Sequence, residues 1–211
     1  MRADVFDHVW RAEGTVLPLA DYQAEFDEVY GGAEEEVWKL ERAQHFHESD
    51  VASWRAAAEG DWPRSLALIE EMRGPLTEMY RGLPRFLRLR VVELPLTPYL
   101  QWEAHVFAIR VSAGEAIRVL PASAVARLEQ MTTLPELVIF GPDLMYQVCY
   151  DEVGAASGAR RITDARVVTP CRAAVISLYG EAEDLLPFFD REVAPLRPPE
   201  HLLPGRTGFG S

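Results

Sequence analysis

Hydrophobic positions between residues 85 and 120 follow a strand–helix–strand pattern. The aliphatic run Phe86–Val92 is typical of a buried strand, and Thr97-Pro98 supplies a helix N-cap followed by proline at the first helical position. Gly114 marks the end of this helix, and residues 116–120 are short enough to form the next parallel strand. Because a βαβ unit needs a sheet covered by helices, this stretch predicts an α/β core.

The pattern outside this unit predicts further elements of a mixed sheet. Residues 4–12, 18–30, 51–60 and 64–81 have helical patterns, the last of them broken at Gly74-Pro75, and residues 37–48 favour a strand over a helix. Residues 136–140 and 144–150 flank a Gly-Pro-Asp turn and predict a hairpin, with helices expected within 173–193. We therefore expect a mainly helical N-terminal region at 1–84, an α/β domain at 85–193 and a Pro/Gly-rich tail at 194–211.

Charged residues interrupt the apolar face of the central helix. At 100° per residue, Glu103 and Arg110 fall inside the arc that should pack on the sheet, two turns apart. Ionised groups are costly there unless they are paired. Arginines also occur in both flanking strands, so one carboxylate and several guanidiniums are expected to converge with two aromatic rings. The predicted site comprises Arg88, Arg90, Tyr99, Trp102, Glu103, Arg110 and Arg118.

Two interpretations of this site remain open. Glu103 can form a structural ion pair, with arginine stems packed along the sheet. Alternatively, arginines in excess over Glu103 can line a pocket for an anionic or planar small molecule at the carboxyl ends of the parallel strands. The number of arginines is the observation in favour of the pocket.

Composition narrows the possible partners. The net charge of −12 is concentrated in residues 1–84, which carry 18 acidic and 8 basic side chains, whereas residues 85–211 carry 15 and 13. Phosphate backbones repel such a surface, so direct nucleic-acid binding is not expected, and the acidic half either serves solubility or meets a basic protein. Lys39 is the only lysine, so the α/β portion offers no Schiff-base or P-loop lysine.

Targeting and cofactor signals are missing from the sequence. No apolar run approaches the length of a membrane span and the first ten residues do not resemble a signal peptide, so we expect no membrane contact and a cytoplasmic location, with Cys149 and Cys171 reduced. His45, His47 and Glu48 form an HxHE cluster, in which the two histidines would share one face of a strand. No third metal-binding partner is identifiable beside the histidines, so neither a metal nor a cofactor is predicted.

Several motifs carry a resemblance to a known family. The segment RVVELPLTPYLQWE, with WKLERAQHF and SWRAAAEGDW before it and ELVIF, MYQVCYD and FFDREVAPL after it, resembles the bacterial domain-of-unknown-function family 6879 over most of residues 35–196. Members are often encoded beside helix-turn-helix regulators, so the resemblance implies a regulatory role. The order of elements is also similar to one half of the phospholipase-D-like fold, but the hairpin ELVIFGPDLMYQVCYD lacks the His-x-Lys catalytic pair.

These observations lead to two functional hypotheses. The first is a non-catalytic regulatory module that binds a ligand or a protein, such as a helix-turn-helix regulator. The alternative is a small enzyme of specialised metabolism, with Glu103 as general acid/base and arginines holding an anionic substrate. The sequence supports the enzyme less well, because no nucleophile–base pair accompanies Glu103.

Overall fold

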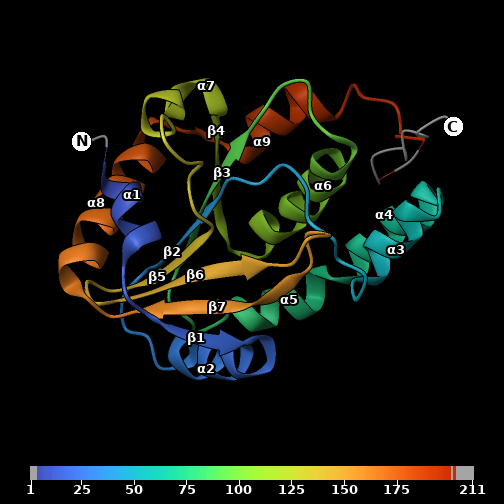
Figure 1. Ribbon diagram of the computed structural model, residues 1–211. Helices are drawn as coiled ribbons and strands as arrows, with labels where there is room; N and C mark the ends of the chain where they lie inside the picture. Colours follow the sequence, from blue (N-terminus) through green and yellow to red (C-terminus); the bar gives the residue numbers. More distant parts are fainter. Residues whose placement is uncertain (1–3, 201, 203–211) are drawn as a thin grey trace, which may run out of the picture.

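A single eight-stranded mixed sheet runs through the computed structural model, which describes residues 4–200 and 202 (Figure 1). The strand order is β1-β7-β6-β5-β2-β3-β4-β8. Strands β2, β3 and β4 are parallel and all other neighbours are antiparallel. The strands are β1 (Thr15–Pro18), β2 (Val37–Glu41), β3 (Phe86–Val92), β4 (Ala116–Pro121), β5 (Leu137–Phe140), β6 (Leu144–Tyr150), β7 (Ala156–Ile162) and β8 (Glu183–Asp184).

Helices cover both faces of this sheet. In Figure 1, α1 and α8 lie on one side and α6 on the other. The helices are α1 (Val5–Arg11), α2 (Leu19–Gly31), α3 (Ala52–Ala58), α4 (Trp62–Glu71), α5 (Arg73–Tyr80), α6 (Pro98–Ala113), α7 (Ala122–Val125), α8 (Ala165–Glu181) and α9 (Leu185–Phe188), with a 3₁₀ turn at Ala126–Leu128 and a π turn at Phe189–Val193. None of the helices among the described residues is both long and apolar enough to span a membrane.

The predicted mixed sheet and its strand–helix–strand unit are confirmed. Strands β3 and β4 pair in parallel, and α6 connects them. The Thr97 hydroxyl caps α6 by accepting a hydrogen bond from the Leu100 amide at 3.1 Å. Gly114 follows the helix at φ +122°, a conformation that a residue with a Cβ rarely adopts, so the chain can turn directly into β4. The predicted hairpin is also present as β5 and β6.

The N-terminal region is not separate from the sheet. Its described part, residues 4–84, contains five helices, but it also supplies β1 and β2, and β2 lies between β5 and β3. The strand predicted over 37–48 ends at Glu41, and residues 42–51 form a loop without helix or strand. A boundary at residue 84 would therefore cut through the sheet, with β1 and β2 on one side of it and β3 to β8 on the other. Most of the predicted tail at 194–211 lies outside the described residues, but Leu202 is buried against the α6 side.

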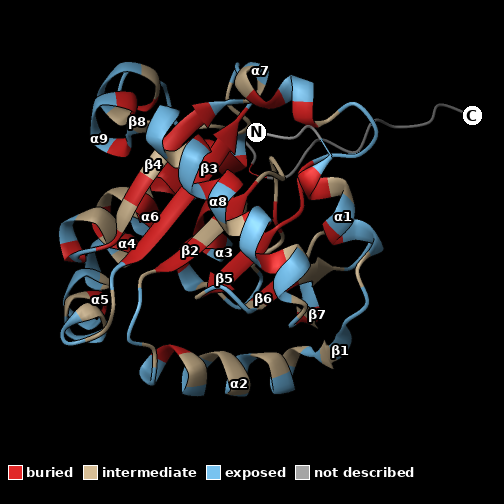
Figure 2. Cartoon of the chain, turned by 90° about the vertical axis from the view of Figure 1, so that its left-hand side faces the viewer, coloured by how far each residue is buried: buried red, intermediate tan, exposed pale blue. Residues whose placement is uncertain are grey.

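Alternation along β2 and β3 gives the two faces of the sheet different chemistry. Figure 2 shows that the central strands are almost entirely buried. Trp38, Leu40, Leu87 and Leu89 point to the α1 and α8 side, where they join an apolar core. The alternate positions of the same strands carry charged side chains, which are enclosed on the α6 side. This second face holds the candidate site.

Candidate functional site

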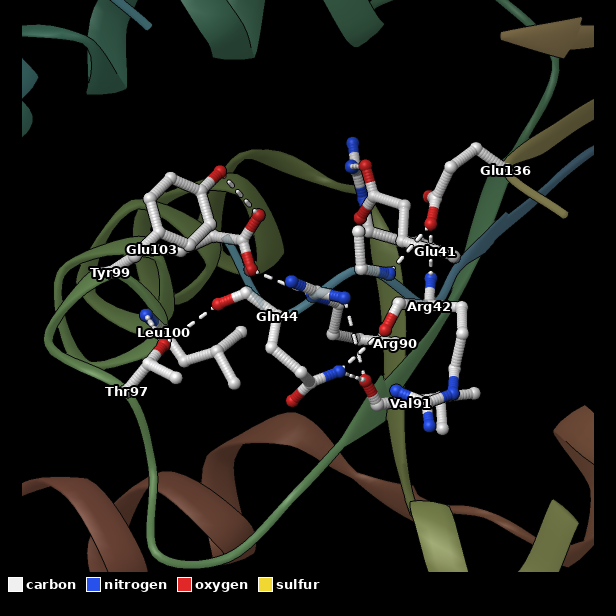
Figure 3. Close-up of polar contacts among 12 residues, drawn as sticks. Glu41, Arg42, Gln44, Arg90, Val91, Thr97, Tyr99, Leu100, Glu103 and Glu136 are labelled. Atoms are coloured by element: carbon white, nitrogen blue, oxygen red, sulfur yellow. Dashed lines mark hydrogen bonds and ion pairs between the residues drawn. The ribbon is translucent and has the colours of Figure 1, made fainter. Parts of the chain in front are cut away.

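Charged side chains occupy alternate positions of β2 and β3, and the register of the strands places them side by side. Lys39 lies opposite Arg88 and Glu41 lies opposite Arg90. Helix α6 and the loop that follows β2 cover them, as Figure 3 shows for Arg90, Glu103 and Tyr99. Burying so many charges is tolerable only because they pair with one another.

The first part of this buried network is centred on Arg90 and Glu103. The Arg90 Nε donates to Glu103 Oε2 at 2.7 Å, and the two residues are 1% and 5% exposed. Glu103 Oε1 lies 2.9 Å from the Tyr99 hydroxyl, which in turn lies 2.6 Å from Glu48 Oε1. The Arg90 guanidinium also lies over the ring of Phe46, 5.6 Å from its centroid. A continuous polar chain therefore joins Arg90 to Glu48.

The second part is centred on Arg88. Its Nε donates to Glu115 Oε1 at 2.6 Å and its Nη1 donates to Glu41 Oε1 at 2.7 Å. Lys39 Nζ lies 2.7 Å from the same Glu41 oxygen. Arg110 pairs with Glu115 at 3.3 Å, and the Tyr80 hydroxyl also donates to Glu115. The β2–β3 face thus contains a chain of alternating positive and negative groups.

Burial and charge set the protonation of these carboxyl groups. Burial raises the pKa of Glu103 to about 7, because Glu41 and Glu48 add to the desolvation and Arg90 offsets only part of it. Burial acts in the same direction on Glu41, but Arg88, Lys39 and Arg90 outweigh it and hold the pKa of that carboxyl well below its usual range. Arg88 and Arg110 likewise lower the pKa of Glu115 against its desolvation. Of these three carboxyl groups, Glu103 is therefore the one whose pKa is shifted toward neutral pH.

Three polar atoms of the network have no hydrogen-bond partner among the described residues. They are Glu41 Oε2, Glu136 Oε2 and Arg90 Nη2. Glu136 projects from the start of β5, and its other oxygen accepts from the amides of Arg42 and Ala43 at 2.8 and 2.6 Å (Figure 3). Burial raises the pKa of Glu136. Two buried carboxylate oxygens in this region can therefore each accept a further hydrogen bond.

Two pockets flank Tyr150 at the carboxyl end of β2. One, of about 400 Å³, is lined by residues that include Arg42 and Glu136. The other, of about 300 Å³, is called the acidic pocket below, and its charged and aromatic lining comprises Lys39, Glu41, Phe46, His47, Glu48, Asp50 and Tyr150. The Phe46 and Tyr150 rings stack at 4.6 Å between centroids and form part of the acidic pocket's wall.

The structure brings together most, but not all, of the predicted site. Six predicted residues lie on the α6 side: Arg88, Arg90, Tyr99, Trp102, Glu103 and Arg110. Arg118 does not join them, because alternation along β4 turns it to the α8 side, where it pairs with Asp184 at 2.9 Å and lies over the Tyr179 ring. The expected excess of arginines around Glu103 is not formed, since Arg88 and Arg110 have carboxylate partners of their own.

Sequence reasoning missed the carboxylates that balance these arginines. Glu41 ends a strand and alternates with Lys39, which is a readable signal, and Glu115 directly follows the Gly114 helix stop. The position of Glu136 could not be predicted from a local pattern. Its hydrogen bonds come from the amides of Arg42 and Ala43, about 90 residues earlier in the chain.

The HxHE cluster lies in the loop after β2 and not on a strand. His45 packs edge-on against Tyr99 and His47 against Trp54, with ring centroids 5.2 and 4.6 Å apart. Burial lowers the pKa of His45, with His47 adding to the effect. Within the part of the chain that the structure describes, no three His, Cys, Asp or Glu side chains are grouped closely enough to hold a metal ion.

The fold and site together define a mixed α/β protein with a buried ion-pair network. The chain matches the family model described as Domain of unknown function (DUF6879) over residues 24–190, and it belongs to that family. No curated protein matches it in sequence. Among solved structures it is similar to TrmBL2, described as an archaeal chromatin protein with a novel mode of DNA binding, at 13% identity and a TM-score of 0.42. The match covers 81% of this chain and 52% of that chain, so the chain spans about half the length of TrmBL2.

This comparison contradicts the prediction that nucleic acid is not a direct partner, because TrmBL2 is described as binding DNA. The prediction rested on the net charge of −12, and a net charge does not report the field at one face of a molecule. At this TM-score the likeness locates no DNA contact on the chain. Nucleic acid is therefore no longer excluded, and no DNA site is assigned.

Proposed function

We propose that the protein is a non-catalytic binding module of regulatory type, acting with a protein partner such as a helix-turn-helix regulator. The observation that carries the proposal is that all four predicted arginines form ion pairs within the chain itself, two of them almost fully buried. Side chains held in this way are part of the packed scaffold and are poorly placed to turn over a substrate. We therefore assign the proposed binding function to the surface around the acidic pocket.

The segments around the acidic pocket are held in place by hydrogen bonds, which supports a preformed binding surface. The His47 amide donates to the Gly154 carbonyl at 2.9 Å, and Arg55 Nη1 donates to the Ser49 carbonyl at 2.7 Å. In the turn that follows β6, the amides of Val153 and Ala155 donate to Asp151 at 3.0 and 2.9 Å. Ordering such loops before binding reduces the entropy lost on association.

The proposal includes a phospholipase-D-like half without catalytic function. Its support is the succession of β3, α6 and β4 followed by the β5–β6 hairpin. The hairpin sequence has neither histidine nor lysine, so the His-x-Lys pair of the enzymes is absent from it. A scaffold of this kind would retain binding and lose phosphoryl transfer.

Copurification with matched charge variants tests the proposal. The full chain is tagged in its native host, and bound proteins and small molecules are quantified by mass spectrometry for the wild type, Asp50→Lys and Glu181→Lys. Both positions are exposed, and Glu181 ends α8 on the opposite side of the sheet. We expect a partner that is lost with Asp50→Lys and kept with Glu181→Lys. A partner profile that is empty, or equally affected by both changes, would refute the proposal.

One observation favours the enzyme as second candidate. A carboxyl with a pKa of about 7 suits general acid/base catalysis at neutral pH, and Glu103 has one. Tyr99 and Glu48 separate it from the acidic pocket, so a substrate there would exchange protons through them. The two candidates can be distinguished by incubating a metabolite extract with the wild type and with Glu103→Gln. A product formed by the wild type and not by the variant would support the enzyme and refute the non-catalytic module.

A further inference from the structure

We propose that the acidic pocket binds an organic ammonium group, and that binding releases the proton of the Glu103 carboxyl. The inference rests on the proposed binding function and adds the chemical class of the ligand. The ammonium group belongs either to a free amine, such as a diamine, or to a lysine side chain of a protein partner. The ammonium chemistry is common to both.

The charge of the pocket lining selects a cation. Three carboxylate residues, Glu41, Glu48 and Asp50, line the pocket, and Lys39 is the single Lys or Arg among the described lining residues. A volume of about 300 Å³ suits a side chain or a small molecule. A metal ion is a poorer match than an extended amine, because these carboxylates do not form a group able to hold a metal within the described part of the chain.

Glu41 provides independent support for a cationic ligand. Its carboxylate is almost fully buried, and one oxygen already accepts from Arg88 and pairs with Lys39. The other oxygen, Oε2, has no hydrogen-bond partner among the described residues. The Lys39 contact shows that an ammonium fits against this carboxylate, and the unpartnered oxygen leaves capacity for a second one.

The Tyr99 hydroxyl lies between two carboxyl groups, and this contact bears on the number of protons in the site. This hydroxyl lies within hydrogen-bonding distance of both Glu48 Oε1 and Glu103 Oε1, at 2.6 and 2.9 Å. A phenol has one hydrogen to donate, so the second contact is a hydrogen bond only if one of the two carboxyls is protonated. Because Arg90 occupies Glu103 Oε2, the proton resides on the Oε1 side, within the Glu48–Tyr99–Glu103 chain.

The arrival of an ammonium would favour loss of this proton. The charged groups that face Glu103 are Arg90 from β3, Glu41 from β2 and Glu48 from the following loop, and His45 lies against Tyr99. An added positive charge beside Glu48 stabilises a second carboxylate in the pair, so the proton leaves to solvent. The exchange replaces one proton with one ammonium, and no bond to carbon is formed or broken.

Calorimetry and a proton-release assay test the inference on the full chain. The probes are putrescine and an acetylated, amidated Gly-Lys-Gly peptide, with 1-butanol as the uncharged control. A pH dye in weakly buffered solution near pH 7 reports protons released. For the wild type we expect binding of at least one amine, no binding of butanol and release of up to one proton per chain. Tighter binding of the peptide assigns the site to a protein partner, and tighter binding of putrescine assigns it to a free amine.

Variants separate the pocket from the proton. Glu48→Gln, at a partly exposed position, should weaken amine binding by roughly 10- to 100-fold through loss of a charge-assisted hydrogen bond. Glu103→Gln should bind but release no proton, and Glu181→Gln, remote from the pocket, should behave as wild type. Absence of amine binding, binding that Glu48→Gln leaves intact, or binding without proton release in the wild type would each overturn the inference. A protein partner that copurifies regardless of Glu48→Gln would overturn it while leaving the proposed function standing.

Discussion

Replacing Glu103 with glutamine should make the protein more stable at alkaline pH, although it removes a buried ion pair. Glutamine reproduces the protonated carboxyl: its amide oxygen can accept from Arg90 Nε, and its amide nitrogen can donate to the Tyr99 hydroxyl. The variant should therefore match the wild type at low pH, where Glu103 holds its proton.

The sign and size of the effect follow from the pKa of Glu103, which rises from 4.5 to about 7 on folding. Between these pH values the folded protein binds more protons than the unfolded chain, so the stability of the wild type falls as pH increases through this window. The shift corresponds to roughly 3 kcal/mol. Relative to Glu103→Gln, the wild type should lose about that free energy of unfolding between pH 4.5 and about pH 7.5.

Urea unfolding followed by tryptophan fluorescence at a series of pH values measures this difference. Taking the difference between variant and wild type at each pH cancels the titration of other groups, such as His45 and His105, whose pKa values burial lowers. Glu181→Gln serves as the exposed control and should track the wild type. A difference that stays constant with pH, or one in which the wild type gains stability as pH rises, would refute the reasoning.

Three further outcomes are expected. Arg90→Met should cost about 1–3 kcal/mol in chemical denaturation, because it removes the buried hydrogen-bond donor of Glu103 and a positive charge beside Glu41, and an unchanged free energy of unfolding would contradict this role. Gly158→Ala should weaken the β1–β7 pairing, because Gly158 has φ +148° and an added Cβ would collide with the Leu17 carbonyl; amide exchange in β1 and β7 should rise, and unchanged protection of both strands would argue against it. Cys171 is buried with its pKa raised to about 12, so Ellman's reagent should modify only Cys149 in the folded chain, and two reactive thiols would contradict the buried position.

The parts of the fold that sequence predicted are those in which local signals agree with packing. The Thr97-Pro98 start and the Gly114 stop fixed α6, and alternation placed Arg88 and Arg90 on one face of β3. The helix at 165–181 was harder to predict, because it begins at an Asp164 cap and contains Pro170 in its interior. Proline in the interior of a helix removes a backbone hydrogen bond, so the sequence pattern favoured a helix that starts only after Pro170.

The candidate site was only half predictable, for a related reason. Glu103 lies on the apolar face of a helix, so its pairing with an arginine could be predicted from the sequence. The identity of that arginine could not, because it depends on the register of the strands. Arg118 lies one strand away from Arg90, yet it faces the opposite side of the sheet. The pairing partners of Arg88 come from β2 and from the start of β4, and no local pattern links those segments to β3.

The central position of β2 has a consequence for how the chain assembles. Its neighbours in the sheet come from far along the sequence: Val37 pairs with Phe86 on one side and with Phe140 on the other. Closing such long loops is slow compared with forming local turns, so the middle of the sheet should be completed only after most of the chain has been synthesised. A fragment that begins at residue 85 would leave β3 and β5 without the strand between them, with two apolar, unpaired edges exposed. Cutting the chain at that point should therefore give an aggregating fragment and not an isolated α/β domain.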